Sequence, residues 1–138
     1  MSAPIAPAAP SGSQAVTDPH PLAAPLAEAF LGAVEPDPMD FLMLLTELSQ
    51  LTPPDYVTVW SDVISVATGV PTTPRERAEY SFSAQAQLVD AKKLAARLGE
   101  SSEKLQRLVM RAIRLQLLAQ QRRRIARARP ADAGSAVA

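Results

Sequence analysis

Prolines divide this sequence into segments that each suit a helix but cannot join into one long element. Proline lacks a backbone N–H and breaks a helix interior, yet it is tolerated in a first turn. The chain has 138 residues and 13 prolines, and beyond residue 30 they stand between candidate helices, at Pro36, Pro38, Pro53, Pro54, Pro71, Pro74 and Pro130. We therefore predict an all-α fold with a disordered leader (1–21), short apolar helices (22–70), a C-terminal α-hairpin or long kinked helix (71–129) and a frayed tail (130–138).

The leader consists mostly of Pro, Ala and Ser, and such a composition buries too little apolar surface to fold. It is either a terminus without a role or an uncleaved, unstructured export signal. It has no basic residue, which a secretory signal peptide needs before its apolar stretch. No apolar run in the chain approaches the roughly 18–20 residues that span a bilayer. We expect the chain to be made in the cytoplasm and, if exported into a cell-envelope assembly, to leave without a cleaved signal.

Two short helices are predicted next. Residues 22–34 place Leu26, Ala29 and Phe30 on one face, and Pro36 ends this segment. Asp37 and Pro38 then have the residue types of an N-cap and a first helical position. The following segment is apolar nearly all round, so another element must bury it: a second subunit, or the C-terminal helices of the same chain. Its candidate partner-binding residues are Phe41, Leu44, Leu45 and Leu48.

Residues 56–68 carry two conflicting patterns. The segment is rich in β-branched residues, which favours a strand. Val59, Val63 and Val66 also fit one face of a helix, and a single strand would have no partner to pair with. We therefore predict a helix that ends before Gly69.

The best local signal is Thr73-Pro74-Arg75-Glu76, a capping box with proline at the first helical position. It predicts a helix from Pro74 to about Leu98, followed after Gly99 by a second one from Ser102 to about Arg127. Each has an apolar seam with coiled-coil-like spacing of three and four residues. The seam residues expected to bind a partner or a second copy are Leu88, Leu98, Leu105, Leu108 and Leu115.

Charge is distributed very unevenly. The first basic residue is Arg75, and eight acids precede it; all 14 basic residues and only six acids lie from Arg75 onward. This asymmetry predicts a basic segment that meets an acidic partner. The candidate basic patch is Arg107, Arg111, Arg114, Arg122, Arg123, Arg124 and Arg127.

Four interpretations of this basic segment stay open. It is a solvated helix end that complements the helix dipole, a nucleic-acid site, a membrane-surface helix, or one half of a head-to-tail contact with the acidic half of a second copy. No aromatic residues interleave with the arginines, which disfavours reading of nucleic acid. The same lack of Trp and Phe disfavours membrane binding.

The residues offer no constellation for catalysis. There is no cysteine, and the single histidine, His20, stands between prolines in the leader, where we expect it to be solvated. A zinc site, a Ser-His-Asp triad and a phosphate-binding glycine loop are therefore not expected. Glu47 and Asp55 are interpreted as surface charges. With few aromatics and much alanine, a large globular core is not expected either. We expect no enzyme, cofactor, metal or small-molecule substrate.

The layout resembles the inner-rod proteins of bacterial type III secretion systems. The resemblance rests on the PLAEAFLGAV and LLTELSQL segments and mainly on residues 74–111, and it ends before the arginine-rich extension. The matching positions are Leu94, Ala95, Leu98, Gly99, Ser102, Leu105, Leu108 and Val109. It implies a small exported subunit that polymerises by helical packing with itself and with other secretion-apparatus subunits. The alternatives are a phage or nucleic-acid-associated assembly protein that uses the basic helix, and a helical adaptor or chaperone.

Overall fold

A computed structural model gives the structure of residues 19–128, which form five α-helices and no strand. The predicted all-α class is confirmed. Most of the predicted leader and the whole predicted tail (130–138) lie outside the described residues. The helices are α2 (Ala23–Leu31), α3 (Pro38–Ser49), α4 (Pro53–Thr68), α5 (Pro74–Gly99) and α6 (Glu103–Ala128).

Three of the helices begin at a capping residue followed by proline. The side chain of Asp37 accepts a hydrogen bond from the backbone N–H of Met39 at the start of α3. Thr73 and Glu76 form the predicted capping box at the start of α5, with bonds of 3.1 and 2.9 Å. Thr52 caps α4 in the same way: its hydroxyl accepts a hydrogen bond from the backbone N–H of Asp55. Prolines therefore start helices here, because their missing N–H would lack an intrahelical partner in the first turn anyway.

The segment that could have been a strand is the helix α4, as predicted. Tyr56, Val59 and Val63 are buried and follow one another at helical spacing. At the end of α4, Gly69 adopts a left-handed conformation with φ of 71°, which a residue with a Cβ rarely adopts.

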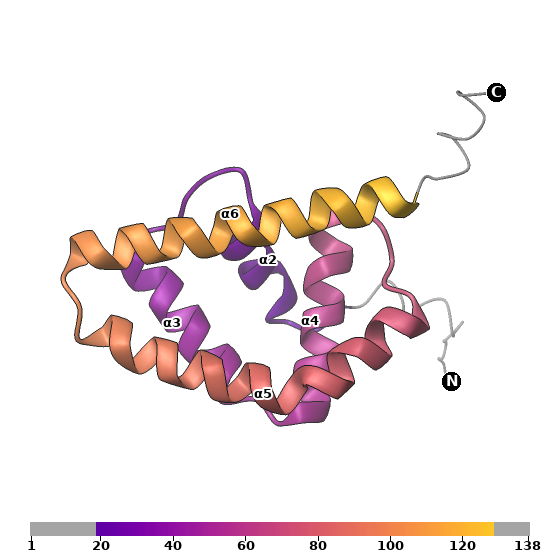
Figure 1. The fold of residues 1–138 in the computed structure, drawn as a ribbon, viewed down its shortest axis with the longest axis horizontal. Helices are drawn as coiled ribbons and strands as arrows, with labels where there is room; N and C mark the ends of the chain where they lie inside the picture. The colour runs from indigo at the N-terminus through magenta and orange to yellow at the C-terminus, as the bar shows by residue number, and fades with distance from the viewer. Residues whose placement is uncertain (1–18, 129–138) are drawn as a thin grey trace, which may run out of the picture.

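The two long helices enclose the three short ones. In Figure 1, α6 and α5 run along opposite sides of the molecule, with α3, α2 and α4 between them. α5 packs on α3 and α4, and α6 packs on α2, α3 and α4. The chain reverses through residues 100–102, yet α5 and α6 do not pack along each other. Neither a packed hairpin nor one kinked helix describes this arrangement, because the short apolar helices occupy the space between the two long ones.

A single core joins all five helices, so the expectation of little core was wrong. Phe30 stacks on Phe41 with ring centroids 4.7 Å apart and meets Trp60 edge-on at 6.2 Å, which ties α2, α3 and α4 together. Phe41, Leu45 and Leu48 are buried in this core. The apolar residues of α3 are therefore covered mainly within the chain, and the prediction that these three side chains bind a partner was wrong. None of the described helices combines the length and the apolar character needed to cross a membrane.

Candidate functional site

The predicted basic patch does not form one surface. Arg114 and Arg124 are only 6% and 7% exposed and face inward from α6, on the same side of the helix as the fully buried Met110. Their inclusion in an accessible basic patch was therefore wrong. Both are held by hydrogen bonds to other helices, so they are structural residues.

Arg114 closes the C-terminal end of α2. Its Nη1 donates to the carbonyl oxygen of Ala29 at 2.7 Å, and its Nη2 donates to that of Gly32 at 2.8 Å. The last carbonyls of a helix lack intrahelical donors and carry partial negative charge, so a guanidinium is a favourable partner. A Cβ at Gly32 would lie 2.4 Å from the carbonyl oxygen of Glu28, which explains the glycine there.

Arg124 joins the end of α6 to the connection between α4 and α5. Its guanidinium binds both carboxylate oxygens of Glu76, with 3.0 Å between Nη2 and Oε1. It also donates to the Thr68 hydroxyl and to the carbonyls of Val70 and Pro71. The hydrogen bonds that Arg124 donates to the Glu76 carboxylate lower the pKa of Glu76, with a further contribution from the Thr73 N–H. Glu76 therefore serves the capping box of α5 and the anchor of α6 at once.

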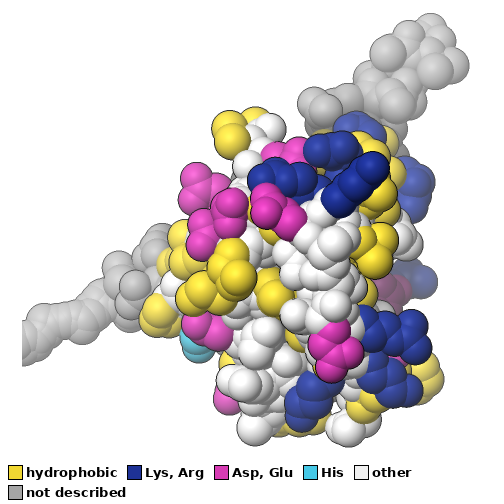
Figure 2. Space-filling view, turned by 90° about the vertical axis from the view of Figure 1, so that its left-hand side faces the viewer, with side chains coloured by type: hydrophobic (Ala, Val, Ile, Leu, Met, Phe, Trp, Pro, Cys, Tyr) yellow, Lys and Arg dark blue, Asp and Glu magenta, His cyan; other side chains and the backbone are white. Residues whose placement is uncertain are grey.

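The exposed arginines are partly neutralised. Nη2 of Arg111 lies 3.3 Å from Glu35 in the α2–α3 loop, and Nη2 of Arg107 lies 2.9 Å from Glu103 one turn earlier in α6. The other three predicted members, Arg122, Arg123 and Arg127, are exposed and make no ion pair within residues 19–128. Figure 2, which views the end where α5 passes into α6, shows basic side chains in separate groups with acidic ones between them.

The outer face of α6 is apolar. Leu105, Leu108 and Leu115 are 47%, 53% and 59% exposed, and Ala112 and Ala119 continue this seam at spacings of three and four residues. At 3.6 residues per turn this seam lies opposite Met110 and Arg114. No described residue covers it, so these three leucines remain candidates for binding a partner or a second copy. Lys104, Arg111 and Arg122 lie along its flank, so the surface combines leucines with positive charge. We call it the α6 outer face.

The seam residues predicted on α5 have a different position. Leu88 and Leu98 are buried in the core and are not available to a partner. Phe82, on the same helix, is 94% exposed. The α5 seam therefore binds the short helices, and only the seam of α6 remains open.

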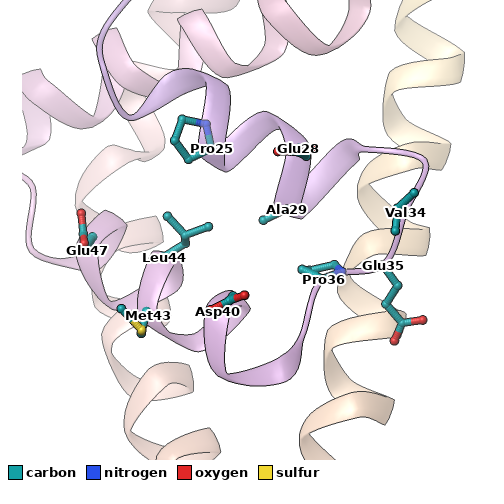
Figure 3. A pocket seen from close by; sticks show the side chains of 10 residues that line it. All are labelled: Pro25, Glu28, Ala29, Val34, Glu35, Pro36, Asp40, Met43, Leu44 and Glu47. Carbon is teal, nitrogen blue, oxygen red and sulfur yellow. The ribbon is translucent and has the colours of Figure 1, made fainter.

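A groove between α2 and α3 forms a second apolar surface, which the sequence interpretation missed. Its volume is about 410 Å³. Figure 3 shows Leu44 pointing into it between α2 and α3, while Glu35 points away toward α6. Its lining combines four acids with apolar side chains: Glu28, Glu35, Asp40, Glu47, Pro25, Ala29, Val34, Pro36, Met43 and Leu44. Two features of the sequence could have indicated it. The segment of α3 has more apolar residues than one core-facing side needs, and residues 23–50 contain no basic residue. We call this site the acidic groove.

Metal-binding clusters and the larger cavities were the remaining candidates for a site. Residues 19–128 contain no group of three or more His, Asp or Glu side chains that could hold a metal. A cavity of about 430 Å³ between α4, α5 and α6 is lined by Tyr56, Trp60 and Tyr80 among others. Burial raises the pKa of Tyr56 to about 12, so its hydroxyl is no base at neutral pH. Glu47 and Asp55 are both exposed.

His20 is not the freely solvated residue that the sequence suggested. Its backbone N–H donates to Oδ2 of Asp62 at 2.8 Å, and its Nδ1 accepts from the N–H of Leu22 at 3.0 Å. It therefore anchors the start of α2 to α4. No general acid or base role follows from these contacts.

A comparison with protein families, curated proteins and solved structures finds no match for this chain. The resemblance to inner-rod proteins stays a prediction.

Proposed function

We propose that this chain is a non-enzymatic structural subunit that assembles with other protein chains through the α6 outer face. The observation that carries the proposal is the exposure of Leu105, Leu108 and Leu115 along one line of a helix whose opposite side is buried. Exposed apolar side chains that line up on one face mark an interaction site more often than single scattered ones do.

A protein partner suits this surface better than nucleic acid. Phosphate groups are bound by accessible Lys and Arg, but two of the seven predicted arginines are buried and two more are paired within the chain. The middle of the α6 outer face consists of leucine and alanine, whose side chains have no charge or hydrogen-bond donor to bind a phosphate. Single-strand binding further requires aromatic side chains for stacking, and this helix has none.

The setting that we propose is a protein-secretion assembly. The support is the resemblance to inner-rod proteins, whose matching positions Ser102, Leu105 and Leu108 fall at the α5–α6 turn and on the α6 outer face. A subunit that polymerises needs an apolar surface that its own fold leaves uncovered, and the α6 outer face has this property.

Sedimentation velocity of the wild type and of the double variant Leu108→Asp, Leu115→Asp tests the proposal. We expect concentration-dependent association of the wild type and loss of that association in the variant. Phe82→Asp is the matched control, because it places one carboxylate at an exposed apolar position outside the α6 outer face. Equal association of the double variant and the wild type would contradict the proposal.

Two other classes of partner are tested with the same proteins. Tight binding of duplex DNA at about 0.15 M salt, lost when Arg122, Arg123 and Arg127 become Ala, would replace the proposal by the nucleic-acid alternative. Co-sedimentation with anionic phospholipid vesicles, lost in the Leu108→Asp, Leu115→Asp variant, would replace it by a membrane-surface function.

A further inference from the structure

We propose that the acidic groove of one copy receives the α6 outer face of a second copy, so that the chains join head to tail. This inference rests on the proposed function, because it names the partner of the α6 outer face. Two surfaces of complementary character support the inference. One is an apolar groove with an acidic rim, and the other is an apolar helix face with basic flanks.

The apolar parts of the two surfaces match. Val34, Met39 and Met43 on and beside the acidic groove are 77%, 56% and 56% exposed. With the three leucines of the α6 outer face they account for most of the large exposed apolar side chains in residues 19–128; the others are Val66, Phe82 and Val89. Leu44 lies half-buried in the groove and Met43 lines it. Methionine side chains are flexible and adapt to an incoming apolar surface, so a ridge of leucines is a suitable occupant.

The charges match as well. Glu28, Asp40 and Glu47 are exposed around the groove, and residues 23–50 contain no basic residue. Between Lys104 and Arg127, α6 contains no acidic residue. A contact between two α6 outer faces would therefore bring like charges together, whereas a contact with the groove brings opposite charges together. Complementary charge raises the association rate and disfavours the wrong pairing.

The groove is already formed in the single chain. Glu35, on its wall, is bound by Arg111 of the same chain's α6, and Arg114 holds the carbonyls of Ala29 and Gly32 next to it. The acceptor surface therefore needs little rearrangement on binding, which lowers the entropic cost of association. The remaining three acids of the rim make no ion pair within the described residues and can face the Lys and Arg flanks of the partner.

The two surfaces are different patches of one molecule, so this contact is heterologous. Such a contact leaves a free acidic groove at one end of a dimer and a free α6 outer face at the other. It therefore continues into an open filament or closes into a ring. The rim charges also make association weaken as salt rises, since exposed charges are screened within about 8–10 Å at physiological salt.

A complementation experiment tests the pairing. The seam variant carries Leu108→Asp and Leu115→Asp and keeps its groove. The groove variant carries Asp40→Lys and Met43→Lys and keeps its α6 outer face. All four positions are exposed, so both variants should give the circular dichroism spectrum of the wild type and the melting temperature that the wild type has at concentrations where it is monomeric. Each alone should be monomeric by sedimentation, and an equimolar mixture should form a heterodimer that grows no further. Phe82→Asp should associate like the wild type.

The outcomes separate this inference from the proposed function. If the groove variant alone associates as strongly as the wild type while the seam variant does not, the groove is not the acceptor, and the proposed function stands. If the seam variant associates like the wild type, both fail. A mixture that stays monomeric overturns the head-to-tail pairing, and so does a wild type that stays monomeric at high concentration and low salt.

Discussion

The two faces of α6 differ in where they depart from the usual distribution of residue types. The inner face carries Arg114 and Arg124, each less than a tenth exposed, whereas the outer face carries three leucines that are about half exposed. The difference teaches that an arginine can lie on the buried side of this helix, beside apolar core residues such as Met110, where neighbouring helices supply hydrogen-bond acceptors. A guanidinium is costly to bury unless its donors are satisfied, and here the end of α2 and the α4–α5 connection supply the acceptors.

The sharpest test of this comparison is Arg124→Met against Arg123→Met. The first removes the partner of Glu76, Thr68 and two loop carbonyls, so we expect a loss of about 3–5 kcal/mol in the free energy of unfolding. The second changes an exposed arginine of the same helix turn and should stay within about 0.5 kcal/mol of the wild type. Urea denaturation measures both. Equal small effects would show that Arg124 is not an anchor.

Arg114→Met should have the next largest effect. It leaves the carbonyls of Ala29 and Gly32 without their charged donor, and we expect a loss of about 2–3 kcal/mol. Arg107→Met is the exposed control on the same helix, and its pair with Glu103 at i, i+4 contributes only about 0.3–0.5 kcal/mol. A smaller loss for Arg114 than for Arg107, measured by thermal unfolding, would contradict the inner position of Arg114.

The fall of the free energy of unfolding at acid pH, the acid limb of the pH–stability curve, tests the role of Glu76. Arg124 lowers the pKa of Glu76 from its ordinary 4.5, so the folded chain binds fewer protons at this carboxyl than the unfolded chain near that pH. Its stabilisation is therefore full above about pH 4.5 and is lost as the pH falls through the lowered folded pKa. Glu76→Gln should cost about 1–2 kcal/mol at pH 7 and flatten this acid limb. Glu79→Gln makes the same change at an exposed position of the same helix and should cost less than about 0.5 kcal/mol at pH 7.

The smallest effect concerns a buried polar side chain that has no hydrogen-bond partner. If buried polar groups stabilise this fold only through their hydrogen bonds, removing such a group should cost nothing. Ser61 is buried, and its hydroxyl has no hydrogen-bond partner among residues 19–128. Ser61→Ala should therefore be neutral or stabilising by up to about 1 kcal/mol. Ser49→Ala is the matched control, because the Ser49 hydroxyl donates to the carbonyl of Thr46 at 2.7 Å; it should lose about 0.5–1.5 kcal/mol. A clear loss in the free energy of unfolding of Ser61→Ala would contradict this expectation.

Local features of the sequence predicted the helices well. The capping box at Thr73 and the Asp37-Pro38 start depend on residues within three positions of each other, and both were confirmed. α5 and α6 lie within about a residue of their predicted bounds, because proline and glycine act on their immediate neighbours. The spacing of the leucines also predicted the seam of α6. That α5 and α6 do not pack along each other could not be predicted in this way.

The rest of the candidate site depends on contacts between distant residues. Arg114 meets Ala29 and Arg124 meets Val70 across 85 and 54 positions, and nothing near either arginine in the sequence indicates the carbonyls that accept its hydrogen bonds. The acidic groove likewise exists only because α2 and α3 lie side by side. Charge counting therefore overestimated the accessible basic surface of α6 and missed the apolar groove.

The central claim is that the inner face of α6 holds the fold and the outer face holds a partner. Its most direct test is the Leu108→Asp, Leu115→Asp variant, measured by sedimentation velocity together with urea unfolding. We predict that self-association is lost while the free energy of unfolding, extrapolated to the monomer, stays within about 0.5 kcal/mol of the wild type. Retained association, or a loss of stability comparable to that of Arg124→Met, would contradict the claim.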